Sequence, residues 1–256
     1  MKKVTAFIGC ASKKHTHYAV RQFLSTLQSL GDVKSEIVVL SDYNVKTCRG
    51  CKTCFLKGEE FCPLKDDRDV LIGKMMASDG VVFASPNYSY QVSAIMKTFL
   101  DRLGFVFHRP RFFGKTFTSI VVQGIYGGSK IVKFLDFVSM GLGFNVVKGS
   151  CVTALDPMTE KEKQKIDSIL AAHSRRFYEQ LVMPAYPVPT LIKLWAFRYA
   201  RTSMGLQLDD RNRDYRYYRD QGWFDSDYYY SIRLGALKKA AGRFFDSLTA
   251  RSVKKR

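Results

Sequence analysis

The sequence has no hydrophobic run that approaches the roughly 20 apolar residues a membrane-spanning helix needs. It also lacks the pattern of a secretory signal peptide, because Gly9 and a polar stretch follow the apolar residues 4–8 too soon. Internal repeats and low-complexity tracts are absent, which excludes a repeat architecture. We therefore expect a cytoplasmic protein without a spanning membrane segment.

Cysteines are few, six in 256 residues, and four of them lie close together in the sequence. Disulfides are rare in a reducing cytoplasm, so clustered cysteines in such a protein more often bind metal or take part in redox chemistry. Cys10 and Cys151 stand apart beside predicted strands, and we interpret both as small core residues.

Acidic residues are also scarce: 23 Asp and Glu face 41 Lys and Arg, giving a formal net charge of +18. Such a surface favours anionic partners, including phosphorylated cofactors and acidic redox proteins. Basic and aromatic residues mix at 211–219, where stacking on nucleic-acid bases is conceivable, but aspartates interrupt the stretch and no known module is visible. We expect no nucleic-acid partner and interpret most of the charge as a solvated surface.

Apolar strands and amphipathic helices alternate five times over the first 180 residues. This alternation predicts an α/β fold, a doubly wound five-stranded parallel sheet of the flavodoxin-like order. The expected strands are 4–8, 36–40, 81–84, 117–122 and 145–152, and the expected helices are 17–30, 66–76, 93–103, 130–140 and 159–181.

We predict two parts for the chain. Residues 1–183 form the flavodoxin-like domain, with an irregular cysteine-rich insertion at 41–65. Pro184, Pro187 and Pro189 then end the pattern, and 184–256 form a basic, aromatic-rich helical extension. Apolar residues of the extension fit one helical face, which we expect to pack on its own domain or a second subunit, with a membrane surface as the alternative: Leu234, Leu237, Ala241, Phe244, Phe245 and Leu248.

Three loops follow predicted strands at the edge where such sheets bind ligands. The loop 9–16 precedes a helix and offers backbone N–H groups, hydroxyls and positive charge to a phosphate, although it has neither the Walker lysine nor the three-glycine dinucleotide pattern. The loop 84–90 offers the Asn87 amide and tyrosine rings to a planar heterocycle. Glycines at 124, 127 and 128 allow a flat ligand to approach the backbone.

At these positions the chain resembles the NADPH-dependent FMN reductases and the related iron–sulfur flavoproteins, over about residues 1–180. The resemblance depends on 9–16, Asp66-Asp67, 77–82, Pro86-Asn87-Tyr88 and 97–102. It implies an FMN-dependent oxidoreductase that uses NAD(P)H, in a homo-oligomer (dimer or tetramer). The residues that would contact FMN are Ser12, Lys13, His15, Thr16, Pro86, Asn87, Tyr88, Gly124, Tyr126, Gly127 and Gly128.

Four cysteines form the motif C-x2-C-x2-C-x7-C followed by proline: Cys48, Cys51, Cys54 and Cys62. Bacterial ferredoxins share the compact start and the trailing proline, whereas structural zinc sites more often use two separated pairs. The resemblance to iron–sulfur flavoproteins implies a [4Fe–4S] cluster here. A zinc site, a redox-active thiol set and a motif without a cluster remain the alternatives.

Two functions fit these features. In the first, an enzyme passes electrons from NAD(P)H through FMN, with or without the cluster, to a small-molecule or redox-protein acceptor. In the second, an electron-transfer or redox-sensing module docks an acidic partner without turning over NAD(P)H. The sequence identifies no catalytic residue, because the cofactor carries the chemistry and needs no acid–base pair.

Overall fold

The computed structural model describes residues 1–254, which divide into two compact units. The first unit comprises Met1–Cys48, Leu64–Gly104 and Pro110–Ala185. The second comprises Arg49–Pro63, Phe105–Arg109 and the chain from Tyr186 onward. The cysteine-rich segment therefore belongs mainly to the same unit as the C-terminal helices.

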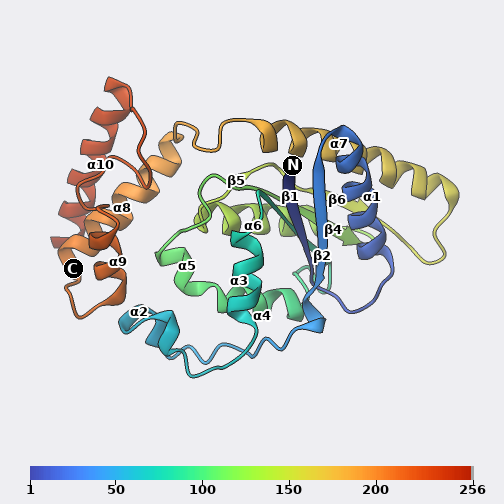
Figure 1. The fold of residues 1–256 in the computed structure, drawn as a ribbon, viewed down its shortest axis with the longest axis horizontal. Coiled ribbons are helices and arrows are strands. Elements are labelled where there is room, and N and C mark those ends of the chain that lie inside the picture. Colours follow the sequence, from blue (N-terminus) through green and yellow to red (C-terminus); the bar gives the residue numbers. More distant parts are fainter. Residues whose placement is uncertain (255–256) are drawn as a thin grey trace. The chain divides into compact units, whose positions relative to one another are not determined.

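A parallel sheet forms the centre of the first unit (Figure 1). Its strands are β1 (Lys2–Ile8), β2 (Val33–Val39), β3 (Gly80–Pro86), β4 (Thr116–Gln123), β5 (Asn145–Val146) and β6 (Ser150–Thr153). The order is β2-β1-β3-β4-β5, and β6 pairs with β4 further along the same edge. This confirms the flavodoxin-like order, with β5 and β6 as two pieces of the fifth strand.

The predicted fifth strand is broken because side chains of β4 and of the helix that follows it make some of the hydrogen bonds that its backbone would otherwise make to β4. Thr118 Oγ1 donates to Val147 O at 2.9 Å, and Asp136 Oδ2 accepts from Gly149 N at 3.2 Å. A Cβ at Gly149 would lie 2.0 Å from Ser119 Oγ, so the backbone approaches β4 more closely there than a side chain allows. Glycine 149 therefore permits the break.

Alternating strand residues bury two apolar layers, one on each face of the sheet. On one face Val4, Ala6 and Ile8 join helices α1 (His15–Leu30) and α7 (Glu160–Val182) in a single core cluster. Phe7 points to the opposite face, where its ring stacks on Phe99 of α4 (Ala94–Arg102) at 5.9 Å. The continuous burial of β1, β3 and β4 follows from this cover on both faces.

The remaining helices of the first unit are α3 (Arg68–Met76) and α6 (Gly128–Gly141). Together with α1, α4 and α7 they confirm the five helices predicted from apolar periodicity, with bounds shifted by a few residues. A capping box begins α7: Thr159 Oγ1 accepts from Glu162 N, and Glu162 Oε2 accepts from Thr159 N at 2.7 Å.

The second unit is helical. Its helices are α2 (Thr53–Leu56), α8 (Leu191–Gln207), α9 (Arg213–Asp220) and α10 (Ala236–Lys254), and α5 (Gly104–His108) contributes all but its first residue. A cluster of aromatic rings holds it together, with Phe197 and Trp223 both in edge contact with Tyr229. The sequence pattern predicted α10 but not α8 or α9. Within residues 1–254 no helix combines the length and apolar character needed to cross a membrane.

Part of the predicted apolar face of α10 does not pack within the chain, so the expectation that it packs on a second subunit stays a prediction. Leu237, Phe244 and Leu248 are 88%, 59% and 46% exposed, and Leu234 is buried but precedes the helix. Helical periodicity correctly placed Leu237, Phe244 and Leu248 on one side. Periodicity alone does not show which side of a helix faces the core. In α10 the opposite side, which carries small and charged residues, contacts the neighbouring helix.

Candidate functional site: a pocket at the carboxyl edge of the sheet

A pocket of about 240 Å³ opens where β1, β3, β4 and β6 end. Its walls come from the three predicted loops and from the connection that follows β6. The lining residues are Cys10, Ser12, Lys14, His15, Thr16, Pro86, Asn87, Tyr88, Val122, Gln123, Gly124, Ala154 and Asp156. Segments distant in sequence thus enclose one cavity at the edge where parallel sheets bind ligands.

The loop after β1 leads into an open helix N-terminus. In the described chain no side chain caps α1, and its first turn contains no acidic residue. The first backbone N–H groups of a helix have no intrahelical acceptor and favour an anion. His15 Nε2 lies 2.9 Å from Asp156 Oδ1, and Lys14 Nζ lies 3.5 Å from Asp156 Oδ2. Asp156 therefore offsets the charge of Lys14 and contacts His15 beside this N-terminus.

A tight hairpin follows β3 and presents Tyr88 to the pocket. Tyr88 and Gln91 exchange backbone hydrogen bonds of 3.1 and 3.0 Å, and the two residues between them, Ser89 and Tyr90, have φ of 50° and 62°. Positive φ at both central residues belongs to the turn that normally uses Asn-Gly. Such strain in residues other than glycine persists where the surrounding structure imposes it, often at functional sites.

Asn87 joins the second loop to the third. Its backbone N–H donates to Val122 O at 2.7 Å, and its side-chain Nδ2 donates to Tyr126 O at 2.9 Å. The other amide atom, Oδ1, is buried and has no hydrogen-bond partner among residues 1–254. A buried acceptor without a donor is costly, so this atom in the pocket wall suits a ligand that carries an N–H or O–H group.

The loop after β4 approaches Tyr90 closely at Gly127. This glycine has φ of +93°, and a Cβ on it would lie 2.5 Å from Tyr90 Cδ1. Gly128 N donates to Gln123 Oε1 at 2.7 Å and begins α6. Only glycine satisfies both the backbone conformation and the close approach at Gly127.

The structure brings most of the predicted FMN-contacting residues to the pocket wall: Ser12, His15, Thr16, Pro86, Asn87, Tyr88 and Gly124. Lys13, Tyr126, Gly127 and Gly128 lie in the same loops but do not line the cavity. Sequence reasoning did not select Cys10, Lys14, Val122, Gln123, Ala154 and Asp156 as site residues. The position of Ala154 and Asp156 in the sequence could have indicated them, because they follow the carboxyl end of the predicted fifth strand.

Of the isolated cysteines, both expected in the core, Cys10 is buried and Cys151 is half-buried. Burial raises the pKa of the Cys10 thiol, which lines the pocket, and raises the pKa of Cys151 to about 11. Both thiols therefore stay protonated at neutral pH and are weak nucleophiles.

The four clustered cysteines do not form a ready-made metal site. Cys48 belongs to the first unit and Cys51, Cys54 and Cys62 to the second. Across residues 1–254 no three His, Cys, Asp or Glu side chains gather closely enough to hold a metal ion. Cys48 and Cys51 are exposed, Cys54 is half-buried and Cys62 is buried.

One cysteine is nevertheless prepared for ligation. The Thr53 hydroxyl donates to Cys51 Sγ at 3.3 Å and lowers the pKa of that thiol. The thiolate is the form that binds metal. The chemistry of the donor set thus fits a thiolate-bound group, although the described conformation does not bring the sulfur atoms together.

The polypeptide before Cys48 is anchored within the first unit. Asp67 Oδ2 accepts from Asn44 N at 2.7 Å, and Asp66 Oδ2 accepts from Lys46 N at 3.0 Å. Arg102 forms a buried pair with Asp66 at 3.0 Å. Burial alone would raise the pKa of Asp66, but the hydrogen bond from Arg102 and the backbone N–H donors lower it. The Asp66-Asp67 pair therefore fixes this segment, and Asp66 Oδ1 also accepts from Arg68 N at the start of α3, at 3.3 Å.

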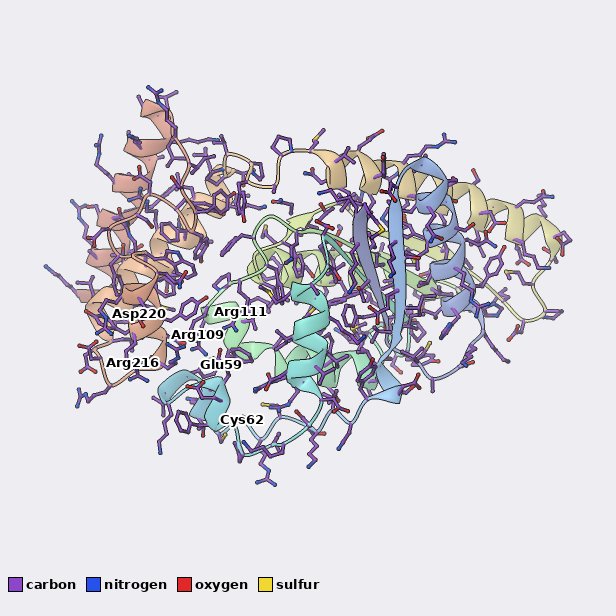
Figure 2. All side chains as sticks on the ribbon, viewed as in Figure 1. Glu59, Cys62, Arg109, Arg111, Arg216 and Asp220 are labelled. Carbon is purple, nitrogen blue, oxygen red and sulfur yellow. The ribbon has the colours of Figure 1, made fainter. Side chains whose placement is uncertain are left out.

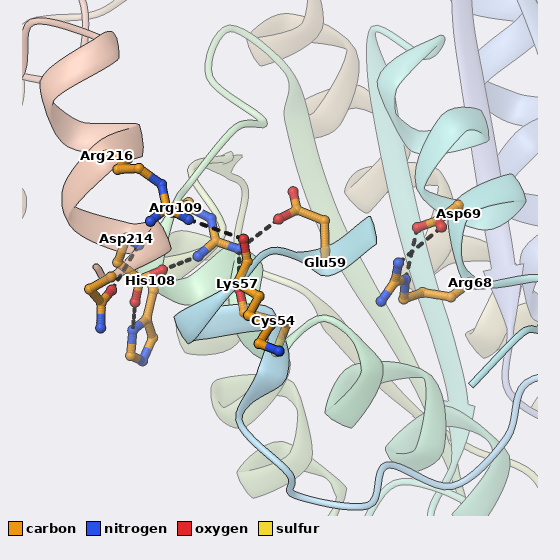
Figure 3. Close-up of polar contacts among 10 residues, drawn as sticks. Cys54, Lys57, Glu59, Arg68, Asp69, His108, Arg109, Asp214 and Arg216 are labelled. Atoms are coloured by element: carbon orange, nitrogen blue, oxygen red, sulfur yellow. Dashed lines mark hydrogen bonds and ion pairs between the residues drawn. The ribbon is translucent and has the colours of Figure 1, made fainter. Parts of the chain in front are cut away.

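The polypeptide around Cys54 is anchored within the second unit by Arg109 (Figures 2 and 3). This fully buried guanidinium donates to Cys54 O at 3.0 Å and to Glu59 Oε2 at 2.8 Å, and it pairs with Asp214 of α9. Arg216 of the same helix donates to Lys57 O at 3.2 Å. A buried network therefore ties the cysteine segment to α9.

Fold and pocket together define a flavodoxin-like α/β protein with a ligand site at the sheet edge. The chain belongs to the NADPH-dependent FMN reductase family, whose family model matches residues 2–155. That family is one of oxidoreductases.

Two relatives from Archaeoglobus fulgidus, both named iron-sulfur flavoprotein, resemble the chain. One is 39% identical over 124 residues, which are 44% of this chain and 56% of that protein. The chain therefore spans little more than half of its length. The other is 30% identical over 142 residues, covering 55% of this chain and 69% of the relative.

Among solved structures, RosB with a bound intermediate, 8-demethyl-8-formylriboflavin-5'-phosphate, matches with a TM-score of 0.59 at 12% identity. The match covers 92% of both chains. At this identity the likeness concerns the fold alone. Because it covers so much of the chain, it includes part of the C-terminal region as well as the sheet.

Proposed function

We propose that this chain holds FMN in the pocket at the carboxyl edge of the sheet and oxidises NAD(P)H there. The observation that carries the proposal is the convergence of three connections on one cavity whose wall contains an unpartnered buried acceptor, Asn87 Oδ1. The family description, NADPH-dependent FMN reductase, agrees with it.

The open N-terminus of α1 suits the phosphate of FMN. Backbone N–H groups and the hydroxyls of Ser12 and Thr16 would donate to it, with Lys13 and His15 adding positive charge. The phosphate and the Asp156 carboxylate would both have to interact with His15 and Lys14. In this proposal the Asp156 carboxylate holds the Lys14 and His15 side chains in place before the cofactor binds.

The second and third loops suit the flavin ring. Asn87 Oδ1 would accept from a ring N–H, and Pro86, Tyr88 and Gly124 would pack against the ring. Tyr126, Gly127 and Gly128 would act from behind this wall, by holding the second and third loops together. When bound, FMN supplies hydride acceptance from a nicotinamide and release of electrons singly or in pairs. The chain's own part is to bind, orient and shield the ring, and no side chain is required as an acid or base.

The direct test is anaerobic purification followed by absorption spectroscopy, FMN titration and steady-state oxidation of NADH and NADPH. We expect a flavin spectrum and NAD(P)H turnover with an added acceptor. A protein that takes up no FMN would refute the proposal. FMN binding without turnover would instead support an electron-transfer module that docks an acidic redox partner through the basic surface.

The Gly127→Ala variant is expected to bind FMN about tenfold more weakly, because a Cβ at φ +93° adds strain and displaces Tyr90. Fluorescence quenching during FMN titration measures the change. Gly222→Ala is the matched control, since Gly222 also has positive φ, +66°, but no atom lies within 4 Å of its Cβ position. Equal flavin affinity in both variants would contradict the role of the third loop.

We further propose that Cys48, Cys51, Cys54 and Cys62 would hold a [4Fe–4S] cluster, which when bound would supply a one-electron carrier. Their spacing, the lowered pKa of Cys51 and the names of the Archaeoglobus relatives support it. Because the four sulfur atoms are not gathered in the described conformation, the segment would have to close around the cluster.

The expected result for this cluster is about four iron and four sulfide per chain after anaerobic purification. The Cys54→Ser variant should lose most of the iron, because three ligands hold a cluster poorly. Cys151→Ser is the control, as this isolated cysteine is remote in sequence from the motif, and it should keep full iron content. If the purified protein contained stoichiometric zinc and no sulfide, the four cysteines would form a zinc site and not hold a cluster.

A further inference from the structure

Helix α10 turns its least apolar side inward. Gly242 and Thr249 are buried, and a Cβ on Gly242 would lie 3.0 Å from the Arg198 guanidinium of α8. Asp246 pairs with Arg198 at 2.9 Å and with Arg201 at 2.6 Å. An amphipathic helix normally buries its apolar stripe. Here small and charged residues make the contact with α8.

The apolar stripe of α10 faces outward. Leu237, Phe244 and Leu248 are 88%, 59% and 46% exposed, and their spacing of seven and four residues places them on one side of the helix. Single exposed apolar residues are ordinary, but an aligned set on one helix marks an interaction surface. We call these three residues the outer stripe.

Positive charge flanks the outer stripe. Arg243, Arg251 and Lys254 are exposed, whereas the single acidic residue of α10, Asp246, is engaged by the two arginines of α8. The solvent side of the helix therefore combines apolar and cationic groups, and none of its exposed residues is acidic. This composition is typical of helices that lie in the interfacial region of a membrane.

Helix α8 adds a second surface of the same kind. Leu191, Ile192, Trp195 and Tyr199 are between 43% and 67% exposed, and the helix contains no acidic residue. Tryptophan and tyrosine are enriched where a membrane meets water, since one part of each ring system is apolar and another is polar.

We propose that α10 docks on the surface of an anionic lipid bilayer, with the outer stripe among the upper acyl chains and the flanking cations at the lipid phosphates. The helix would lie in the plane of the surface rather than cross it, as expected for a basic amphipathic helix. Lipid satisfies both properties of this face, because it offers hydrocarbon and negative charge together.

Two other occupants fit less well. In a twofold contact between copies of α10, the same face meets itself, so the cations of both copies would come together. An acidic polypeptide would satisfy the cations but would need an apolar groove for Leu237, Phe244 and Leu248. Charge complementarity therefore favours the anionic bilayer.

The test is sedimentation of the full chain with vesicles of phosphatidylcholine containing about one third phosphatidylglycerol. We expect binding to these vesicles, and at least about tenfold weaker binding to pure phosphatidylcholine or in molar salt. The triple variant Leu237→Gln, Phe244→Gln, Leu248→Gln should lose most of the binding. A matched control exists in the first unit, where Phe137, Val70 and Met76 are 64%, 52% and 43% exposed. Their triple glutamine variant should bind like the wild type.

Circular dichroism must show that both triple variants are folded, which is expected because every altered side chain is exposed. Failure of the wild type to bind anionic vesicles would overturn the proposal, as would undiminished binding by the α10 variant. A dimer that the α10 variant dissociates, without vesicle binding, would assign the stripe to a second copy. Binding to polyglutamate but not to vesicles would assign it to an acidic polypeptide.

Discussion

Replacing Arg109 by methionine is expected to lower the free energy of unfolding of the second unit by about 3–5 kcal/mol. The guanidinium is fully buried and pairs with Asp214, whose side chain is 3% exposed, and with Glu59. Methionine fills much of the volume but leaves the Asp214 carboxylate buried without its main cation. Removing one partner of a buried ion pair costs far more than the intact pair contributes, because the remaining charge stays desolvated.

Urea unfolding followed by tryptophan fluorescence measures this effect, since Trp195 and Trp223, the two tryptophans of the chain, both belong to the second unit. The control is Arg211→Ala, which removes an arginine that is 92% exposed from its pair with Asp209. An exposed pair contributes about 0–1 kcal/mol. If Arg109→Met cost no more than Arg211→Ala, the buried network would not stabilise the unit.

The same variant tests how the cysteine segment is held. Arg109 donates to Cys54 O and Glu59, so its loss should release α2 from α9 without changing any cysteine. If the cysteines bind iron as proposed, the iron content of Arg109→Met should fall although all four thiols are present. Full iron content together with the expected loss of stability would mean that the segment closes around the cluster without this anchor.

The central fold could be predicted because each element carries a strong local signal. The strand 81–84 is an unbroken apolar run and the helix 93–103 shows a helical apolar period, and the parallel-sheet rule then places the loops after each strand on one edge. The three loops meet at the predicted edge. The contribution of the connection after β6 was not predicted, because Ala154 and Asp156 are not residue types that typically bind a phosphate or a flavin ring.

The second unit could not be predicted, because its stability depends on long-range polar contacts. Arg109 and Asp214 are more than a hundred residues apart, and nothing local in either sequence indicates a pair. Helix α9 is short and consists only of Arg, Asp and Tyr, residue types that are mostly not fully buried, so the burial of Asp214 and Tyr218 could not be predicted from it. Likewise, the cysteine spacing predicts which residues can bind a metal but not whether the thiols are already gathered.

The His173→Gln variant is expected to lose much of the acid sensitivity of the first unit. His173 of α7 is fully buried, and its Nε2 lies 2.6 Å from Thr118 Oγ1. The Thr118 hydroxyl proton is already donated to Val147 O, so Nε2 must carry a proton and donate. Nδ1 has no partner among residues 1–254, so a second proton there would be a buried charge without an acceptor. Burial, with a smaller contribution from Arg176, lowers the pKa of His173 to about 3.

The sign of the effect follows from proton linkage. The unfolded chain takes up a proton at His173 near pH 6.5, whereas the folded chain resists it until about pH 3. The contribution to stability is therefore complete above pH 6.5 and is lost as the pH falls, by about 1.4 kcal/mol per pH unit. Between pH 6.5 and 4.5 the wild type should lose about 2–3 kcal/mol through this residue. Asp66, whose pKa is lowered below 3.8, acts mainly in a more acidic range.

Amide hydrogen exchange in β4 and urea unfolding followed by far-ultraviolet circular dichroism, both at pH 4.5 and 6.5, measure the first unit. His17 also has a lowered pKa through burial and contributes in the same direction, so the comparison of wild type with His173→Gln isolates His173. The glutamine amide can still donate to Thr118 but cannot titrate. The control is His108→Gln, which alters a half-exposed imidazole of the second unit and should leave the pH dependence of β4 unchanged. An equally steep pH dependence in His173→Gln would show that the acid sensitivity arises elsewhere.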